Sequence, residues 1–138
     1  FVAHQFNVYR DRKNKRRDMI VQYLLEAYRR LESAAHREKT EEQAIAFESA
    51  VADIQLLGTF MQISAMVKCA NALASSGGTG TTIDEVLRVL RNNLRKELGL
   101  SALESTPVIF RFERHLDSGN WKGEVVPRTD PVVIARDK

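Results

Sequence analysis

The segment MIVQYLLEAYRRLESAA, residues 19–35, decides the fold of this chain. Its apolar residues recur in steps of three and four, which places them along one face of an α-helix. The stripe consists of Ile20, Tyr23, Leu24, Ala27, Tyr28, Leu31, Ala34 and Ala35. No glycine or proline occurs before Arg37, so we expect one long helix of ~55 Å. The stripe lapses before Met19, and the first half of this helix should therefore project from the domain.

Three more stripes with helical spacing follow, at residues 44–57, 63–74 and 83–98. Thr40 is a suitable N-cap for the first of them. Gly58 fits a helix C-cap, where a left-handed backbone is easiest for glycine. Thr59 and Gln62 form a T-x-x-Q capping box for the next helix. Because the connections are short, neighbouring helices should be antiparallel.

These patterns predict an all-α fold, an antiparallel bundle of about four helices over residues 19–100. Residues 1–18 are expected to be a basic helical extension. From residue 101 onward the pattern changes to the alternation of a β-strand, in PVIFRFER at 107–114. WKGEVV at 121–126 could pair back after the turn LDSGN. Residues 101–138 are therefore expected to be an irregular or hairpin-containing tail.

No catalytic constellation is visible in the 138 residues. The three histidines and Cys69 lie far apart with no metal-ligand spacing between them. The loop GGTGTT at 77–82 resembles a phosphate-binding loop, but it follows a helical pattern and lacks the P-loop lysine. We expect no metal, no cofactor, no small-molecule substrate and no enzymatic activity.

A charge-free run extends from Ile54 to Val67 and is fourteen residues long. That is too short to cross a hydrocarbon core of about 30 Å, and Gly58 interrupts it. We interpret this run as bundle core and expect no membrane span within the sequence.

Six cations crowd into eight positions near the start of the chain: Arg10, Arg12, Lys13, Lys15, Arg16 and Arg17. On a helix they surround the axis, which leaves three interpretations open. They could form a solvated helical extension, or bind nucleic acid phosphates, although only Phe6 and Tyr9 are available for base stacking. They could also lie against anionic lipid headgroups.

The membrane interpretation has further support in the opening residues FVAHQF. These could be the last turn of an apolar span that precedes Phe1, and cations directly after a span hold that flank in the cytoplasm. The expected location is then the cytoplasmic face of a bacterial inner membrane; without such a span, it is the cytoplasm.

The segments RRDMIVQYLLEAYRRLESAAHR (16–37) and AVADIQLLGT (50–59) carry a resemblance. Over about residues 6–100 the chain resembles a group of small, uncharacterised bacterial proteins with one N-terminal membrane helix and a helical cytoplasmic domain. Members of that group often have Pro-Glu where this chain has Phe60 and Met61. The resemblance implies membrane attachment and brings no activity.

The function expected from the sequence is therefore protein–protein interaction or self-association beside a membrane. The 20/24/27/31 stripe is close to a coiled-coil repeat, so it could mediate self-association or form the bundle core. Phe110, Phe112 and Trp121 could be partner-binding anchors or could pack on the bundle. The alternative function is a soluble nucleic-acid-binding module that uses the basic run at 10–17.

Overall fold

The computed structural model describes residues 2–76 and 81–126, and within these it contains four helices and a two-stranded sheet. The helices are α1 (Val2–Ala34), α2 (Glu41–Leu57), α3 (Phe60–Ser76) and α4 (Thr81–Glu97). The strands are β1 (Ile109–Arg114) and β2 (Trp121–Val126). The chain folds as two compact units, the first ending at Ser105 and the second beginning at Thr106. The loop predicted at 77–82 falls mostly outside the described residues, as does the segment 127–138.

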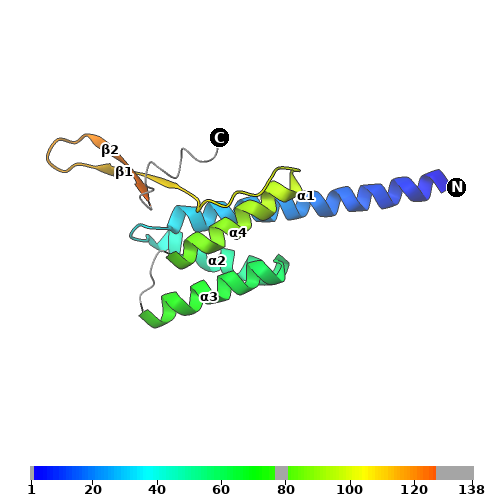
Figure 1. Cartoon of the computed structure of the whole chain (residues 1–138), viewed down its shortest axis with the longest axis horizontal. Coiled ribbons are helices and arrows are strands. Elements are labelled where there is room, and N and C mark those ends of the chain that lie inside the picture. Colours follow the sequence, from blue (N-terminus) through cyan, green and yellow to red (C-terminus); the bar gives the residue numbers. More distant parts are fainter. Residues whose placement is uncertain (1, 77–80, 127–138) are drawn as a thin grey trace. The chain divides into compact units, whose positions relative to one another are not determined.

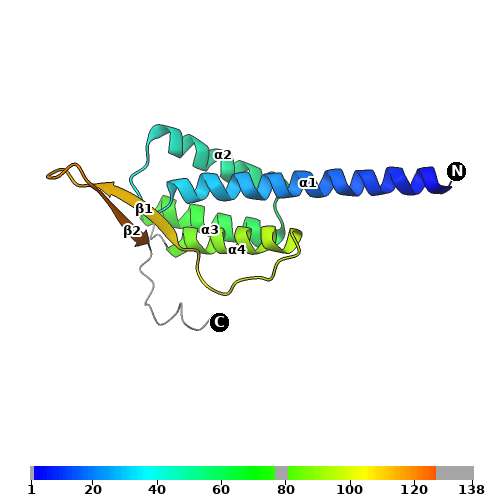
Figure 2. The same cartoon turned by 90° about the horizontal axis from the view of Figure 1, so that it is seen from above.

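The first unit is the predicted four-helix bundle, with successive helices running in opposite directions (Figure 1, Figure 2). α1 packs against α2 and α4, and α3 packs mainly against α4. The core is built from the predicted stripes of α1 and α4, with Leu24, Leu31, Leu87 and Leu90 almost fully buried. Only the second half of α1 takes part, because every residue from 2 to 19 is exposed. The prediction of one long helix with a projecting first half is confirmed (Figure 1).

The ends of the helices follow local sequence signals, with one exception. Thr40 accepts a hydrogen bond from the Gln43 amide at 3.2 Å as the N-cap of α2. Gly99 has φ +74° after the end of α4, the left-handed conformation that favours glycine. The same conformation is predicted for Gly58 after α2, but its φ is −75°. Gly58 is needed for a different reason, since a Cβ there would collide with the carbonyl oxygen of Ile54.

The second unit is a β-hairpin, so the all-α class predicted from the sequence is not exact. β1 and β2 are antiparallel, and Phe110 pairs with Val125, Phe112 with Gly123 and Arg114 with Trp121. The connection closes through hydrogen bonds between His115 and Asn120 and between Gly119 and His115, both 2.9 Å. Both strands and the turn lie where the alternating pattern and LDSGN predict them. Of the two forms expected for this tail, irregular or hairpin-containing, the structure shows the hairpin over residues 109–126.

Gln62 is the polar centre of the bundle, and its side chain is buried. Its Oε1 atom accepts hydrogen bonds from the Thr59 amide at 3.2 Å and from the Tyr23 hydroxyl at 3.0 Å. Its Nε2 atom donates to Oδ1 of Asn93. The main-chain N–H of Gln62 in turn donates a hydrogen bond to the Thr59 hydroxyl at 3.3 Å, which completes the predicted capping box. One side chain thus joins α1, the start of α3, and α4.

Replacing this side chain, Gln62→Leu, should lower the free energy of unfolding by about 2–4 kcal/mol. The change removes the reciprocal cap and leaves the Tyr23 hydroxyl and Asn93 without their partner in the core. Urea denaturation followed by far-UV circular dichroism measures the loss. The matched control is Gln55→Leu, because Gln55 is exposed on α2 and should change stability by less than about 0.5 kcal/mol. Equal effects of the two substitutions would show that the Gln62 hydrogen bonds contribute nothing.

The Tyr23 hydroxyl also makes stability depend on alkaline pH. Burial, with a smaller effect of the negative charge of Asp53, raises its pKa from 10.0 to about 12. The unfolded chain releases this proton near pH 10 and the folded chain keeps it to about pH 12, so the folded state binds more protons in between. The contribution of Tyr23 to the free energy of unfolding is therefore complete below pH 10. As the pH rises from 10 through 12, the free energy of unfolding falls by about 2–3 kcal/mol in total.

Tyr23→Phe should therefore flatten the decline of stability over this pH interval, as measured by urea denaturation at a series of pH values. Part of the slope should remain, because burial also raises the pKa of Tyr28. The control is Tyr9→Phe, at an exposed position on the projecting half of α1. If Tyr23→Phe leaves the slope as steep as in the unsubstituted chain, the Tyr23 hydroxyl is not the group responsible.

Candidate functional site

The candidate site is the basic segment, residues 10–17, on the part of α1 that extends beyond the bundle (Figure 2). All six predicted residues are exposed there: Arg10, Arg12, Lys13, Lys15, Arg16 and Arg17. The sequence places a long helix at this point because no breaker occurs and because the second half of α1 is anchored by its buried stripe. The structure brings the six cations together simply by continuing that helix.

The cations do not cover the whole circumference of α1. At about 100° per residue they span roughly two-thirds of it, and Asp11, Asn14 and Asp18 occupy the rest. The expectation that cations surround the axis on every side is therefore too strong. All six cations are nevertheless exposed, so most of the positive charge of the segment faces solvent.

Apolar and cationic side chains on this part of α1 are separated along the axis. Val2, Phe6 and Tyr9 are 65%, 68% and 69% exposed. The helical repeat puts them on the same face as Lys13 and Arg17 but closer to the N-terminus. The order along the helix is thus apolar, then cationic, then bundle.

Arg17 has an additional structural contact. Its guanidinium donates a hydrogen bond to the main-chain carbonyl oxygen of Glu97, the last residue of α4. A cation at a helix C-terminus complements the helix dipole and satisfies a free carbonyl group. An open hollow of about 880 Å³ lies here, lined mainly by the cations of α1 together with Glu97. Sequence reasoning did not predict this link between α1 and α4.

A second exposed feature is the α2–α3 corner, defined here as Leu56, Leu57, Phe60 and Met61. Their exposed fractions are 79%, 44%, 83% and 64%. The prediction that the run 54–67 is bundle core is wrong for these four residues and for Val67, which is 44% exposed, although Ile54 and Met66 are buried. The reason is that α2 ends and α3 begins at the edge of the bundle, so the turn between them faces outward.

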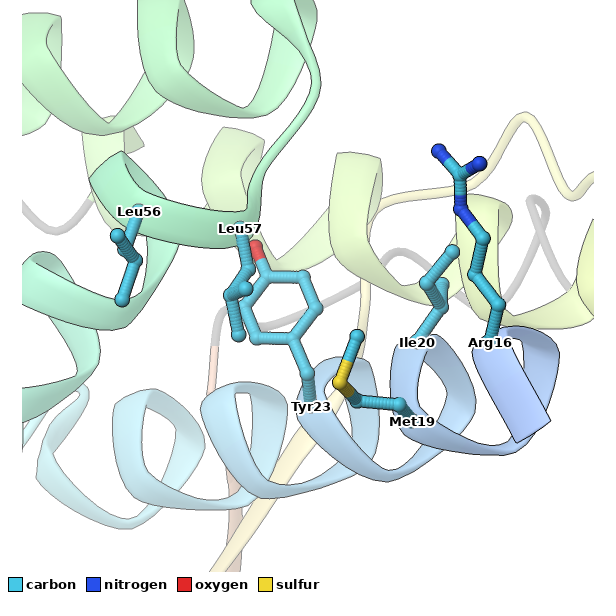
Figure 3. Close-up of a pocket in the computed structure, with 6 residues that line it drawn as sticks. All are labelled: Arg16, Met19, Ile20, Tyr23, Leu56 and Leu57. Atoms are coloured by element: carbon cyan, nitrogen blue, oxygen red, sulfur yellow. The ribbon is translucent and has the colours of Figure 1, made fainter. Parts of the chain in front are cut away.

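The corner lies beside the end of the basic segment. A small pocket of about 190 Å³ is lined by Leu56 and Leu57 together with residues of α1. Figure 3 shows Leu57 beside the Tyr23 ring, Met19 and Ile20 continuing along α1, and Arg16 at the far end of the row. Arg16 therefore belongs both to the basic segment and to the rim of this apolar pocket.

The three aromatic residues predicted as partner anchors share one face of the hairpin. The register places Phe110, Phe112 and Trp121 on the same side of the sheet. They are 52%, 65% and 66% exposed. The rings of Phe110 and Phe112 meet edge to face, with centroids 4.8 Å apart. Phe110 also covers Gly123, where any Cβ would strike its ring.

The buried and half-buried ionisable residues hold helices together. Arg30 of α1 pairs with the half-buried Asp53 of α2. His36 has φ +55° at the end of α1, and its Nε2 atom lies 2.7 Å from Oδ1 of Asp84. Cys69 is fully buried in α3. Within residues 2–76 and 81–126, no three His, Cys, Asp or Glu side chains are grouped so that they could hold a metal ion.

Among the helices described, none is both long and apolar enough to cross a bilayer. Comparison with protein-family models, with curated proteins and with solved structures gives no match to this chain. Function is therefore inferred from the geometry of the chain itself.

Proposed function

We propose that this chain binds an anionic membrane surface through the basic segment of α1 and presents its helical bundle for protein contacts there. The observation that carries this proposal is the exposure of all six cations on a helix that continues beyond the bundle. Juxtamembrane cations are worth about 1 kcal/mol each near anionic lipids, so six of them supply useful affinity without an apolar groove.

The distribution of side chains favours a helix that meets the membrane end-on. A helix that lies flat at the interface has apolar and charged residues on opposite faces. In α1 both kinds share a face and follow one another along the axis, with Val2, Phe6 and Tyr9 ahead of the cations. That is the order met on passing from hydrocarbon through headgroups to water, and aromatic residues are common at that boundary.

The cytoplasmic leaflet is the proposed location, because its anionic lipids attract polybasic segments. The bundle would then be held close to the surface in the cytoplasm. This geometry leaves room for protein partners on the sides of the bundle. It supports a scaffold-like role in which attachment and recognition use different parts of the chain.

For self-association or partner binding, the second half of α1 is already occupied. Tyr23, Leu24, Ala27 and Leu31 are buried against the other helices. Contacts through α1 would have to use its first half, at residues 2–19. The aromatic face of the hairpin offers a separate candidate surface, because exposed aromatic side chains are typical anchors of protein interfaces.

Flotation with vesicles tests the proposal. Binding is expected with vesicles that contain phosphatidylserine and not with phosphatidylcholine alone, and it should weaken as salt rises toward ~0.15 M, where the Debye length is about 8 Å. Duplex and single-stranded nucleic acids are titrated in parallel under the same conditions. Tight, salt-sensitive nucleic acid binding without vesicle binding would overturn the membrane proposal in favour of the alternative module.

A further inference from the structure

We propose that the α2–α3 corner is a second membrane contact, at which Leu56, Leu57, Phe60 and Met61 insert into the interface of an anionic bilayer. This inference rests on the proposed function, since it requires the basic segment to bring the bundle to the membrane. It adds an apolar contact on the bundle itself to the attachment made through the first half of α1.

Four of the exposed large apolar side chains of the chain lie at this one turn, within six residues of each other. Phe60 and Leu56 are 83% and 79% exposed, and only Gly58 and Thr59 separate the two pairs of large residues. Scattered single apolar residues are normal on protein surfaces, but a contiguous group next to a charged rim is typical of an interaction site.

The charge distribution around the corner suits a lipid surface. From Ile54 to Val67 no residue is charged, so insertion would not require a charged group of this turn to leave water. The preceding acid, Asp53, is paired with Arg30. The charge that lines the adjoining pocket is Arg16, the last but one cation of the basic segment (Figure 3). The cation can contact an anionic headgroup while the neighbouring apolar side chains contact the acyl chain of the same lipid.

The turn is also held rigid before it meets any partner. The Thr59–Gln62 capping box fixes the start of α3, and Gln62 is tied to Tyr23 in α1. Gly58 lies so close to the Ile54 carbonyl oxygen that a residue with a Cβ atom would fit there only if the backbone shifted. Because the backbone is ordered in advance, little conformational entropy is lost when the four side chains insert.

The position of the corner along α1 is compatible with simultaneous contact. Leu56 and Leu57 of the corner line the same pocket as Arg16 to Tyr23, so the corner lies beside the C-terminal end of the basic segment. Met19 is six residues beyond Lys13, which corresponds to about 9 Å along a helix. The headgroup layer is itself about 5–7 Å thick. A modest tilt of α1 toward the corner would therefore bring the corner residues into contact with the headgroups.

A second copy of the chain is a less suitable occupant. Stable protein interfaces use about 20–30 residues on each side, whereas the corner offers four large side chains at an outward turn. A lipid surface needs no matching shape, and it supplies the negative charge that Arg16 and its neighbours would meet.

The test places a tryptophan at the corner and measures its environment on vesicles. In a Trp121→Phe background, Phe60→Trp is compared with the matched control Ile45→Trp, at the 59% exposed Ile45 near the opposite end of α2. Vesicles contain phosphatidylserine with or without brominated phosphatidylcholine, and flotation measures binding separately. We expect bromolipid quenching and a blue shift for Phe60→Trp, and neither for Ile45→Trp.

A second pair of variants measures affinity. The change of Leu56, Phe60 and Met61 together to glutamine should weaken binding to anionic vesicles by roughly tenfold to a hundredfold, because partly inserted apolar area is lost. The control Ile45→Gln should leave binding unchanged. All four positions are exposed, so the fold should be retained, and circular dichroism checks this.

The outcomes separate the two proposals. If vesicles bind the chain but Phe60→Trp is not quenched, the corner inference is overturned and the proposed function stands. If no vesicle binds the chain, the proposed function fails and the corner inference with it. A blue shift that depends on protein concentration and needs no lipid would show that a second copy covers the corner, which also overturns the inference.

Discussion

A loss of several thousandfold in binding to anionic vesicles is expected when five cations of the basic segment are changed together to glutamine: Arg12, Lys13, Lys15, Arg16 and Arg17. Each cation near an anionic surface contributes about 1 kcal/mol, so five contribute about 5 kcal/mol. Every 1.4 kcal/mol is about tenfold in affinity. The measurement is the partition coefficient from flotation or sedimentation with phosphatidylserine vesicles at low salt.

The matched control removes the same charge elsewhere. Five exposed cations outside the segment are changed to glutamine: Arg37, Lys39, Lys68, Lys96 and Lys122. This control should lose far less affinity, because those cations are spread over both units. Urea denaturation checks that both variants fold, since the first variant also loses the Arg17 hydrogen bond to Glu97. Equal losses would mean that net charge and not the basic segment drives binding, which contradicts the proposed site.

Leu31→Ala is expected to lower the free energy of unfolding by about 2–5 kcal/mol, the range measured when a buried leucine is truncated and leaves a cavity. Leu31 is fully buried, in the half of α1 that packs on α2 and α4. Small domains are stable by only about 5–15 kcal/mol, so this loss is a large part of the total. Urea denaturation followed by far-UV circular dichroism reports mainly on the helices and is therefore suited to the measurement.

The same truncation at the α2–α3 corner, Leu56→Ala, is the control. Leu56 is 79% exposed, so its loss should change stability by less than about 0.5 kcal/mol. The pair also decides between two interpretations of the α1 stripe. If Leu31→Ala left monomer stability unchanged and only altered self-association, the stripe would be an interface between chains and not the core of one.

Much of the helical architecture was predictable because its signals are local. The spacing of Leu24, Leu31 and their neighbours determines which face of α1 is buried, and no tertiary information is needed for that. The capping box of Thr59 and Gln62 was visible as a four-residue pattern for the same reason. The hairpin was one of two forms expected for the tail, from the alternation in 107–114 and the turn LDSGN, although the fold class assigned to the chain was all-α.

Features that depend on tertiary neighbours were predicted wrongly or not at all. A left-handed conformation is predicted for Gly58, but the approach of the Ile54 carbonyl is what requires a glycine there. Leu57 belongs to the apolar stripe of α2 by spacing, yet it is 44% exposed because the bundle ends there. The role of Gln62 as a link between Tyr23 and Asn93 depends on residues far away in the sequence.

Periodicity, capping and charge are properties of neighbouring residues, so they were enough to predict the four helices and the cluster of six cations and to indicate a hairpin as one form of the tail. The lapse of the apolar stripe before Met19 also indicated that the first half of α1 projects, but which parts of the other helices lie at that end of the bundle became known only from their packing: the α2–α3 corner and the end of α4 lie beside the basic segment. In the part of the chain that the structure describes, no helix packs over residues 2–19, so their cations face outward. The same boundary exposes Leu56 and Phe60 beside Arg16, since a helix can bury its apolar face only where another helix lies against it.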